Sequence, residues 1–235
     1  MTTTLITGAN KGLGFETARR LVAAGHTVYV GSRDAERGRR AAERLGARAL
    51  VLDVTDDASV AAAARAVEAD GGLDVLVNNA GIEGRQEGNT VVGAADVTAD
   101  LMRTLFETNV FGVVRVSHAF LPLLRRSAAP VVVNVSSGLG STTLVSAVGT
   151  PSYGYPGVAY PASKAAVNMI TVQYAKAFPG IRINAVEPGY TATDLNGNTG
   201  TQTVEEGAEI IVRMARMGPD GPTGGYFNAA GPLPW

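Results

Sequence analysis

Two side chains four residues apart, Tyr160 and Lys164, form the pair in this sequence best suited to acid–base chemistry. Residues at this spacing lie one above the other on a helix face. A cation beside a phenol favours the phenolate and lowers the pKa of the phenol, which can then serve as a general acid or base. Taken alone, the pair could equally belong to a solvent-facing helix, because polar pairs at this spacing are common.

The helix that would carry this pair is expected to begin at Tyr160 and to run to about Phe178. Pro161 fits such a start, because a proline in the first turn loses no helix hydrogen bond. Apolar residues at Ala165, Ile170 and Val172 are expected to form its buried stripe.

Composition excludes several other kinds of chemistry. The 235 residues are 46% hydrophobic and 17% charged, with no cysteine and two histidines, His26 and His118. Cysteine nucleophiles, thiolate zinc sites and disulfides are therefore excluded. We expect both histidines to be structural and no metal site to exist. The formal net charge of −1 gives no electrostatic argument for binding nucleic acid or an anionic membrane.

Length and patterning favour one α/β domain over residues 1–235, without an internal repeat. The chain leads directly into an apolar strand with no basic region or cleavage site, and no apolar run is long enough to span a bilayer. We therefore expect a cytoplasmic location. Heavy use of arginine and alanine with few lysines suggests a bacterial source.

A glycine-rich turn follows the first expected strand, 3–7, and precedes a helical pattern. Strand, glycine-rich turn and helix in this order form the phosphate-binding opening of a dinucleotide fold. Gly8 permits the tight turn, Gly12 lets the backbone approach a pyrophosphate, and Gly14 lets the helix pack closely on the strand. The residues expected to contact the cofactor here are Gly8, Asn10, Lys11, Gly12, Leu13 and Gly14.

The end of the second expected strand, 27–31, indicates which cofactor binds. NAD-binding chains often carry an acid here to hold the ribose 2′-hydroxyl, but this sequence has Ser32 and Arg33. A guanidinium suits a 2′-phosphate because it is a planar fork with a fixed positive charge, and Lys11 could add a second cation. These features predict NADP(H), although Arg33 could instead simply begin the charged helix 34–45.

Two further strand ends are expected to contact the cofactor. Asp53 and Val54 follow the strand 49–52, and Asp53 could accept a hydrogen bond from the adenine amino group or cap the next helix. The strand 73–77 is followed by the small and amide residues Asn78, Asn79, Ala80 and Gly81, which leave room for a cofactor but could also form a plain turn.

Taken in order, these motifs resemble the short-chain dehydrogenase/reductase superfamily, and within it the NADPH-dependent carbonyl reductases. The matching pieces are Thr7-Gly8-(three residues)-Gly12-Leu13-Gly14, Asn78-Asn79-Ala80-Gly81, Asn109, Ser136-Ser137, Tyr160-(three residues)-Lys164 and Pro188-Gly189. Asn10-Lys11-Gly12 and the tail segments 205–209 and 221–227 resemble the carbonyl-reductase branch. The resemblance implies a single doubly wound Rossmann-type domain, with a mostly parallel seven-stranded sheet flanked by helices on both faces.

The resemblance also implies roles for the catalytic residues. Tyr160 would be the general acid, and Lys164 would hold the nicotinamide ribose while tuning Tyr160. Both residues are expected to contact the cofactor. Ser137 would hold the substrate carbonyl oxygen, with Ser136 as the alternative. Asn109 lies within a long helix expected over 99–126, in which Pro122 marks a kink or break near the end. Asn109 would shape this helix and hold a water that relays protons to Lys164.

Two segments near these residues are expected to contact the nicotinamide and the substrate. The resemblance implies that the loop after the strand 181–186 closes over the nicotinamide. The polar composition of residues 194–203 predicts a short mobile lid. Segment 138–159 is longer than in most family members, and its two tyrosines are rival candidates for the acid that lack a lysine four residues later. The loop residues are Pro188, Gly189, Thr191 and Thr193, and the expected substrate wall is Ser137, Leu139, Tyr153, Tyr155 and Tyr190.

We therefore expect NADPH-dependent reduction of a small-molecule ketone or aldehyde. A pathway-specific ketoreductase or an alcohol dehydrogenase of the same family is the alternative, and a non-catalytic regulator that senses NADP(H) is another. Such regulators usually lose the tyrosine or the lysine, and this sequence keeps both. The intermediate length of the insertion favours a monomer, although a homodimer or homotetramer is also possible.

Overall fold

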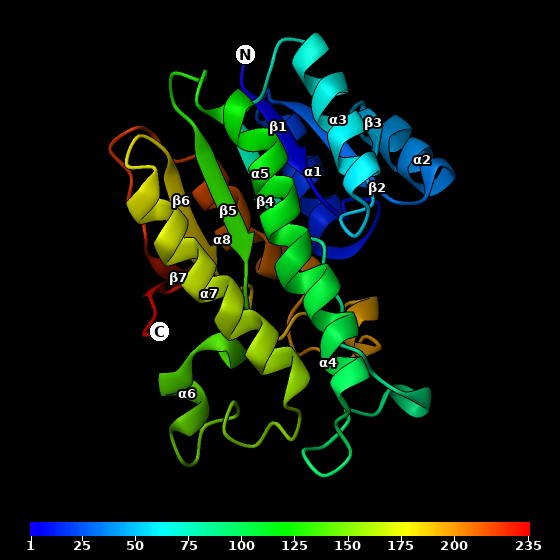
Figure 1. The fold of residues 1–235 in the computed structure, drawn as a ribbon, viewed down its shortest axis with the longest axis vertical. Helices are drawn as coiled ribbons and strands as arrows, with labels where there is room; N and C mark the ends of the chain where they lie inside the picture. Colours follow the sequence, from blue (N-terminus) through cyan, green and yellow to red (C-terminus); the bar gives the residue numbers. More distant parts are fainter.

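An eight-stranded sheet forms the centre of the computed structural model, which describes residues 1–235 (Figure 1). Its order is β3-β2-β1-β4-β5-β6-β7-β8, and all neighbouring strands are parallel except β7 and β8. The strands are β1 (Thr3–Ile6), β2 (Thr27–Ser32), β3 (Arg48–Val51), β4 (Val75–Asn78), β5 (Val131–Val135), β6 (Arg182–Val186), β7 (Tyr226–Asn228) and β8 (Gly231–Pro232). The expected seven strands become eight because the chain folds back after β7 into the two-residue β8.

Helices cover both faces of the sheet, which explains why the central strands β4 and β5 are buried along their whole length. In Figure 1, α5 and α7 lie in front of the sheet and α1 and α8 behind it. One core cluster joins the sheet to α3, α5 and α7, and another joins it to α1, α2 and α8. The helices are α1 (Gly12–Ala23), α2 (Ala35–Leu45), α3 (Asp57–Ala69), α4 (Ala99–Phe106), α5 (Gly112–Leu124), α6 (Thr142–Ser146), α7 (Ala159–Ala177) and α8 (Val204–Ala215). This doubly wound α/β fold confirms the expected fold class.

The long helix expected over 99–126 is present from Ala99 to Leu124, and its winding changes partway along. A π-helical turn, Glu107–Phe111, separates α4 from α5. Pro122 lies in the last turn of α5, and the helix ends at Leu124, close to the expected end. Single π turns inside helices often occur at functional sites, and this one contains Asn109.

The buried face of α7 differs from the apolar stripe expected at Ala165, Ile170 and Val172, which are only half-buried. The stripe prediction was wrong because the fully buried side of this helix is largely polar. Its buried side chains include Tyr160, Ser163, Lys164, Val167, Asn168 and Thr171. Hydrogen bonds with β5 satisfy two of them: Asn134 Nδ2 donates to Thr171 Oγ1 at 2.9 Å, and Lys164 Nζ donates to the Val135 carbonyl oxygen at 2.8 Å.

None of the helices is both long enough and apolar enough to cross a membrane.

Candidate active site

A cavity of about 1330 Å³ lies at the carboxyl ends of the parallel strands. It extends from the glycine turn after β1 to Tyr160 in the first turn of α7. The chain winds in opposite directions from β1 and β4, which are neighbours in the sheet. Ligands of open α/β sheets bind outside the strand ends at such a switch point, so the cavity lies where the fold itself favours a ligand.

The glycine turn has the backbone that a phosphate site requires. Gly8 and Gly12 have φ angles of 65° and 56°, a region that favours glycine. A Cβ at Gly14 would lie 2.5 Å from Asn79 Nδ2 and 2.8 Å from the Gly8 carbonyl oxygen. No side chain caps the start of α1 at Lys11, and its first turn has no acid. The open N–H groups and the helix dipole therefore suit an anion.

Thr7, which the sequence analysis left without a role, ties this turn to the end of β4. Its hydroxyl accepts hydrogen bonds from the backbone N–H groups of Asn79, at 3.0 Å, and Ala80, at 2.9 Å. Asn79 Nδ2 donates in return to the Thr7 carbonyl oxygen, at 2.8 Å. The expected cofactor contacts Gly8, Asn79, Ala80 and Gly81 thus line one rigid corner of the cavity.

The cations expected near a 2′-phosphate are placed differently from one another. Arg33 follows β2, lines the cavity, and forms no ion pair. Lys11 also lines the cavity, but its ammonium lies 2.7 Å from Asp194 Oδ2. The Ser32 side chain does not reach the cavity, because it is buried and donates its hydroxyl hydrogen bond to the Asp34 carbonyl oxygen. Arg33 is therefore the cation that remains available at this position.

Asp53 is not the cap of the helix that follows it. Asp56 caps α3 by accepting hydrogen bonds from Ala58 and Ser59, whereas Asp53 accepts two from Thr55. The Thr55 backbone N–H is the main cause of a lowered pKa at Asp53. An ionised Asp53 and its neighbour Val54 line the cavity at the end of β3, where a carboxylate can accept a hydrogen bond.

Three of the four expected catalytic side chains meet at the opposite end of the cavity, and the fourth, Asn109, does not line it. Tyr160, Lys164 and Ser137 all line it, and the first two are almost fully buried. The alternative Ser136 is less suitable, because its hydroxyl donates a 2.6 Å hydrogen bond to Asn168 Oδ1.

The electrostatics of this group differ from the sequence-based expectation. Burial raises the pKa of Tyr160, and the carboxylate of Glu83 raises it further, whereas the Ser137 hydroxyl acts in the opposite direction. Burial lowers the pKa of Lys164 to about 8, and its Nζ donates to the Val135 carbonyl oxygen at 2.8 Å. The phenol therefore stays protonated at neutral pH, in the form that can donate a proton.

Asn109 holds the backbone beside the cavity. Its Oδ1 accepts from the Ile82 N–H at 2.8 Å, and its Nδ2 donates to the Ile82 carbonyl oxygen at 2.8 Å and to Ser163 Oγ at 3.0 Å. Asn109 lies within the π-helical turn Glu107–Phe111 and is buried there. These contacts position Ile82, and the water relay implied by the resemblance stays a prediction.

The loop after β6 folds over the glycine turn. Pro188, Gly189, Thr191 and Thr193 all line the cavity, and a Cβ at Gly12 would lie 3.6 Å from Thr193 Cγ2. The expected lid is tied down at its buried Asn196, whose Nδ2 donates to the Thr191 carbonyl oxygen at 2.8 Å.

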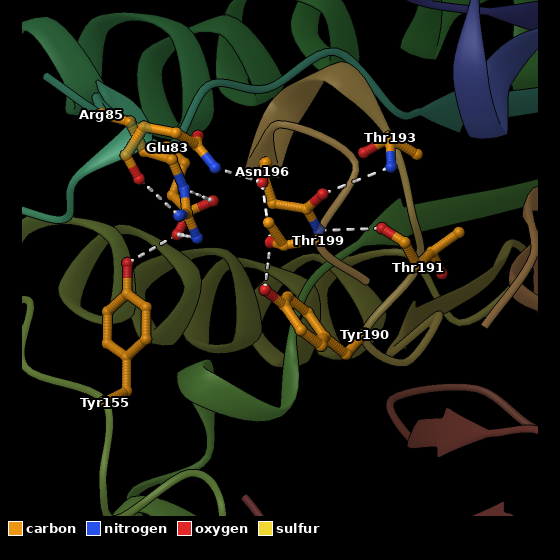
Figure 2. A network of polar contacts seen from close by, with 9 residues as sticks. Glu83, Arg85, Tyr155, Tyr190, Thr191, Thr193, Asn196 and Thr199 are labelled. Carbon is orange, nitrogen blue, oxygen red and sulfur yellow. Dashed lines mark hydrogen bonds and ion pairs between the residues drawn. The ribbon is translucent and has the colours of Figure 1, made fainter. Parts of the chain in front are cut away.

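Of the expected substrate wall, Ser137, Leu139, Tyr155 and Tyr190 line the cavity, but Tyr153 does not and is 53% exposed. Tyr155 is a poor rival to Tyr160, because its hydroxyl donates a 2.8 Å hydrogen bond to Glu83 Oε1 (Figure 2). Burial, with the charge of Glu83 as a second cause, raises the pKa of Tyr155. The hydroxyl proton of Tyr155 is therefore held in the hydrogen bond to the Glu83 carboxylate.

The sequence analysis missed several charged side chains that line the cavity, among them Glu83, Arg85 and Glu187. Glu83 and Arg85 lie in a segment, 82–98, whose polar composition indicated only a loop. Their position directly after Gly81 was the available signal, because that residue already follows a strand end. Glu187 likewise follows β6, and its carboxylate accepts from the Gly189 N–H at 2.8 Å.

Neither histidine lines the cavity. His26 contacts Thr4 through a 2.8 Å hydrogen bond, and His118 is exposed. No group of three or more histidine, aspartate or glutamate side chains is arranged to hold a metal ion.

Comparisons with known proteins identify the family of the chain. A family model for short chain dehydrogenases matches residues 2–204. A (+)-neomenthol dehydrogenase from Capsicum annuum is 32% identical, over 95% of this chain and 94% of that protein.

Two solved structures share the fold closely. The NADPH-bound carbonyl reductase from chicken fatty liver has a TM-score of 0.85 at 27% identity, covering 100% of this chain and 99% of that one. A 3-ketoacyl-(acyl-carrier-protein) reductase from Brucella melitensis, complexed with NADH, has a TM-score of 0.83 at 26% identity, covering 97% of this chain and 96% of that one.

The sequence relatives of the chain include plant and fungal proteins, so they do not support the bacterial source suggested by composition. The family match over most of the chain, the full-length sequence relative and the placement of the motifs around one cavity lead to the same conclusion. The chain belongs to the short-chain dehydrogenase/reductase family, whose oxidoreductases act on carbonyl and alcohol groups.

Proposed function

We propose that this chain reduces a ketone or aldehyde to an alcohol with NADPH. The observation that carries the proposal is the single cavity that joins an open phosphate-binding turn, an unpaired Arg33 and the buried group Ser137, Tyr160 and Lys164. The fit to a dinucleotide rests on the glycine φ angles and on the open N–H groups at the start of α1.

Different residues of the chain would have different roles in the reaction. Bound NADPH would supply the hydride that goes to the carbonyl carbon. Ser137 and Tyr160 would direct hydroxyl groups at the carbonyl oxygen, where negative charge develops, and Tyr160 would transfer its proton to that oxygen. Lys164 would hold the nicotinamide ribose, and Asn109 would fix the neighbouring backbone through Ile82.

The protonation state of the Tyr160 phenol affects which reaction it can catalyse. Alcohol oxidation needs the phenolate, whereas carbonyl reduction needs the phenol. The raised pKa of Tyr160 keeps the phenol available as the proton donor that carbonyl reduction needs. The preference for NADPH rests on Arg33, because the related structures include complexes with either cofactor.

The proposal is tested by following NADPH oxidation by absorbance, with aldehydes, quinones, diketones and ketoesters as substrates. NADH is run in parallel. We expect turnover with NADPH and little with NADH. Strong NADPH binding without turnover on any carbonyl would contradict it and would favour a sensor of NADP(H). The cytoplasmic location and the monomeric state stay predictions from the sequence.

A further inference from the structure

An ion pair lies in the wall of the cavity near Tyr160. Arg85 Nη2 lies 2.8 Å from Glu83 Oε1, and Arg85 Nε lies 2.9 Å from Glu83 Oε2. The two side chains are only 15% and 5% exposed. Removing both charges from water is costly, so a buried pair is weak evidence for stability. Its position in the cavity points instead to a role in binding.

Tyr155 completes this group from a different part of the chain. Its hydroxyl donates to Glu83 Oε1 across a sequence separation of 72 residues. Figure 2 shows the phenol directed at the ion pair, and a bridge between Gly93 and Gly157 holds the same two segments together. We call Glu83, Arg85 and Tyr155 the polar wall. All three residues line the cavity that also contains Tyr160.

The polar wall has no net charge but keeps unused hydrogen-bonding capacity. Arg85 uses Nε and Nη2 for Glu83, and Nη1 donates to the Asn89 carbonyl oxygen at 2.9 Å. A guanidinium has five N–H donors, so donors remain, and the Tyr155 oxygen can still accept. An apolar substrate would exclude water from these groups without replacing its hydrogen bonds, which is unfavourable.

We propose that the polar wall recognises an oxygen substituent of the substrate, so that the enzyme prefers a neutral ketone or aldehyde with a hydroxyl or second carbonyl group. An anionic substrate would compete with Glu83 for Arg85, and a cationic one would compete with Arg85 for Glu83. The neutral oxygenated class leaves the ion pair intact. This inference rests on the proposed carbonyl reduction.

The test compares cyclohexanone with 2-hydroxycyclohexanone, each reduced with NADPH. The ratio of their kcat/KM values is measured in the wild type, in Tyr155→Phe and in the double variant Glu83→Gln/Arg85→Gln. We expect the wild type to favour the hydroxyketone by about tenfold or more. Both variants should lose most of that preference. Tyr155→Phe keeps the ion pair, so it tests the wall even if the double variant does not fold.

Tyr153→Phe is the matched control, because Tyr153 lies two residues away but outside the cavity. It should keep the wild-type ratio, and NADPH binding by each variant confirms that the cofactor end is intact. Turnover with a ratio unaltered by Tyr155→Phe, or a wild-type preference for cyclohexanone, would overturn this inference alone. Absence of turnover on every carbonyl tested would overturn the proposed function and this inference with it.

Discussion

At the glycine-turn end of the cavity the groups that a ligand would meet are largely backbone N–H groups of one short stretch of chain, whereas at the Tyr155 end they are side chains from distant parts of the sequence. The first end uses the open N–H groups of α1 and the φ angles of Gly8 and Gly12. The second joins Tyr155 to Glu83 and, across 107 residues, Asn89 to Asn196. Backbone contacts suit a common group such as a phosphate, while loop side chains suit selection among substrates.

The largest effect should come from adding one methyl group to the glycine-turn end. A Cβ at Gly14 would lie 2.8 Å from the Gly8 carbonyl oxygen and 2.9 Å from Ala9 Cα, so the backbone would have to move. We expect Gly14→Ala to cost about 3 kcal/mol of stability and to weaken NADPH binding strongly. Denaturant unfolding and NADPH titration measure the two effects.

Gly218→Ala is the control for this change, because a Cβ there would meet nothing within 4 Å and the φ angle is not positive. Equal stability and equal NADPH affinity of the two variants would contradict the close approach of the backbone at Gly14.

The buried ammonium of Lys164 should make stability depend on pH. Its pKa falls from 10.5 to about 8 by burial, so the unfolded chain binds more protons between these values. The free energy of unfolding should therefore rise with pH from about 8 to 10.5. The penalty is complete below pH 8 and amounts to about 3 kcal/mol.

Denaturant unfolding of the wild type and of Lys164→Met at pH 7 and pH 10.5 isolates this penalty. The stability difference between the two proteins should change by about that amount, whereas replacing the exposed Lys176 by methionine should leave the pH dependence as in the wild type. If the free energy of unfolding changed equally with pH in the wild type and in Lys164→Met, the Lys164 ammonium would not be desolvated.

Removal of Arg33 should separate the two cofactors. A hydrogen bond to a charged group contributes on the order of 2 kcal/mol, so Arg33→Ala should weaken NADPH about thirtyfold and leave NADH nearly unchanged. Arg37→Ala serves as the control, since this exposed arginine pairs with Asp34. An equal loss for NADPH and NADH would remove the 2′-phosphate argument.

The smallest effect should come from removing one hydrogen bond at the Tyr155 end of the cavity, where the substrate would bind. Asn89 has a φ of 61°, so Asn89→Gly keeps the backbone conformation but removes the 2.6 Å hydrogen bond to the Asn196 carbonyl oxygen. One such bond contributes about 1 kcal/mol, which corresponds to a rise of about fivefold in KM for the carbonyl substrate. A larger change in NADPH affinity than in KM would show that the two ends are not separate.

The same division explains what the sequence could predict. Gly8, Gly12 and Gly14 stand between a strand and a helix, so local spacing was enough to place the phosphate-binding turn. The fold class followed from alternating strands and helices, and the family resemblance followed from motifs in order. The two-residue β8 carried no periodic signal.

Contacts between distant segments could not be predicted in this way. Nothing in the local pattern of 82–98 shows that Glu83 meets Tyr155, or that Tyr153 points away from the cavity. The buried face of α7 was missed for a related reason. Polar residues such as Asn168 and Thr171 are buried there because β5 and the chain around it supply hydrogen-bond partners, whereas hydrophobic periodicity detects only apolar burial.

The most direct test of the proposed function is the rate of NADPH oxidation by Tyr160→Phe on the best carbonyl substrate, with NADPH affinity measured on the same protein. The loss of a general acid typically lowers a rate by about 10²–10⁴-fold. We expect a loss of this size with NADPH affinity within about twofold of the wild type, because the hydroxyl is needed for proton transfer. Retention of most of the wild-type rate by Tyr160→Phe would contradict the central claim that this tyrosine is the acid.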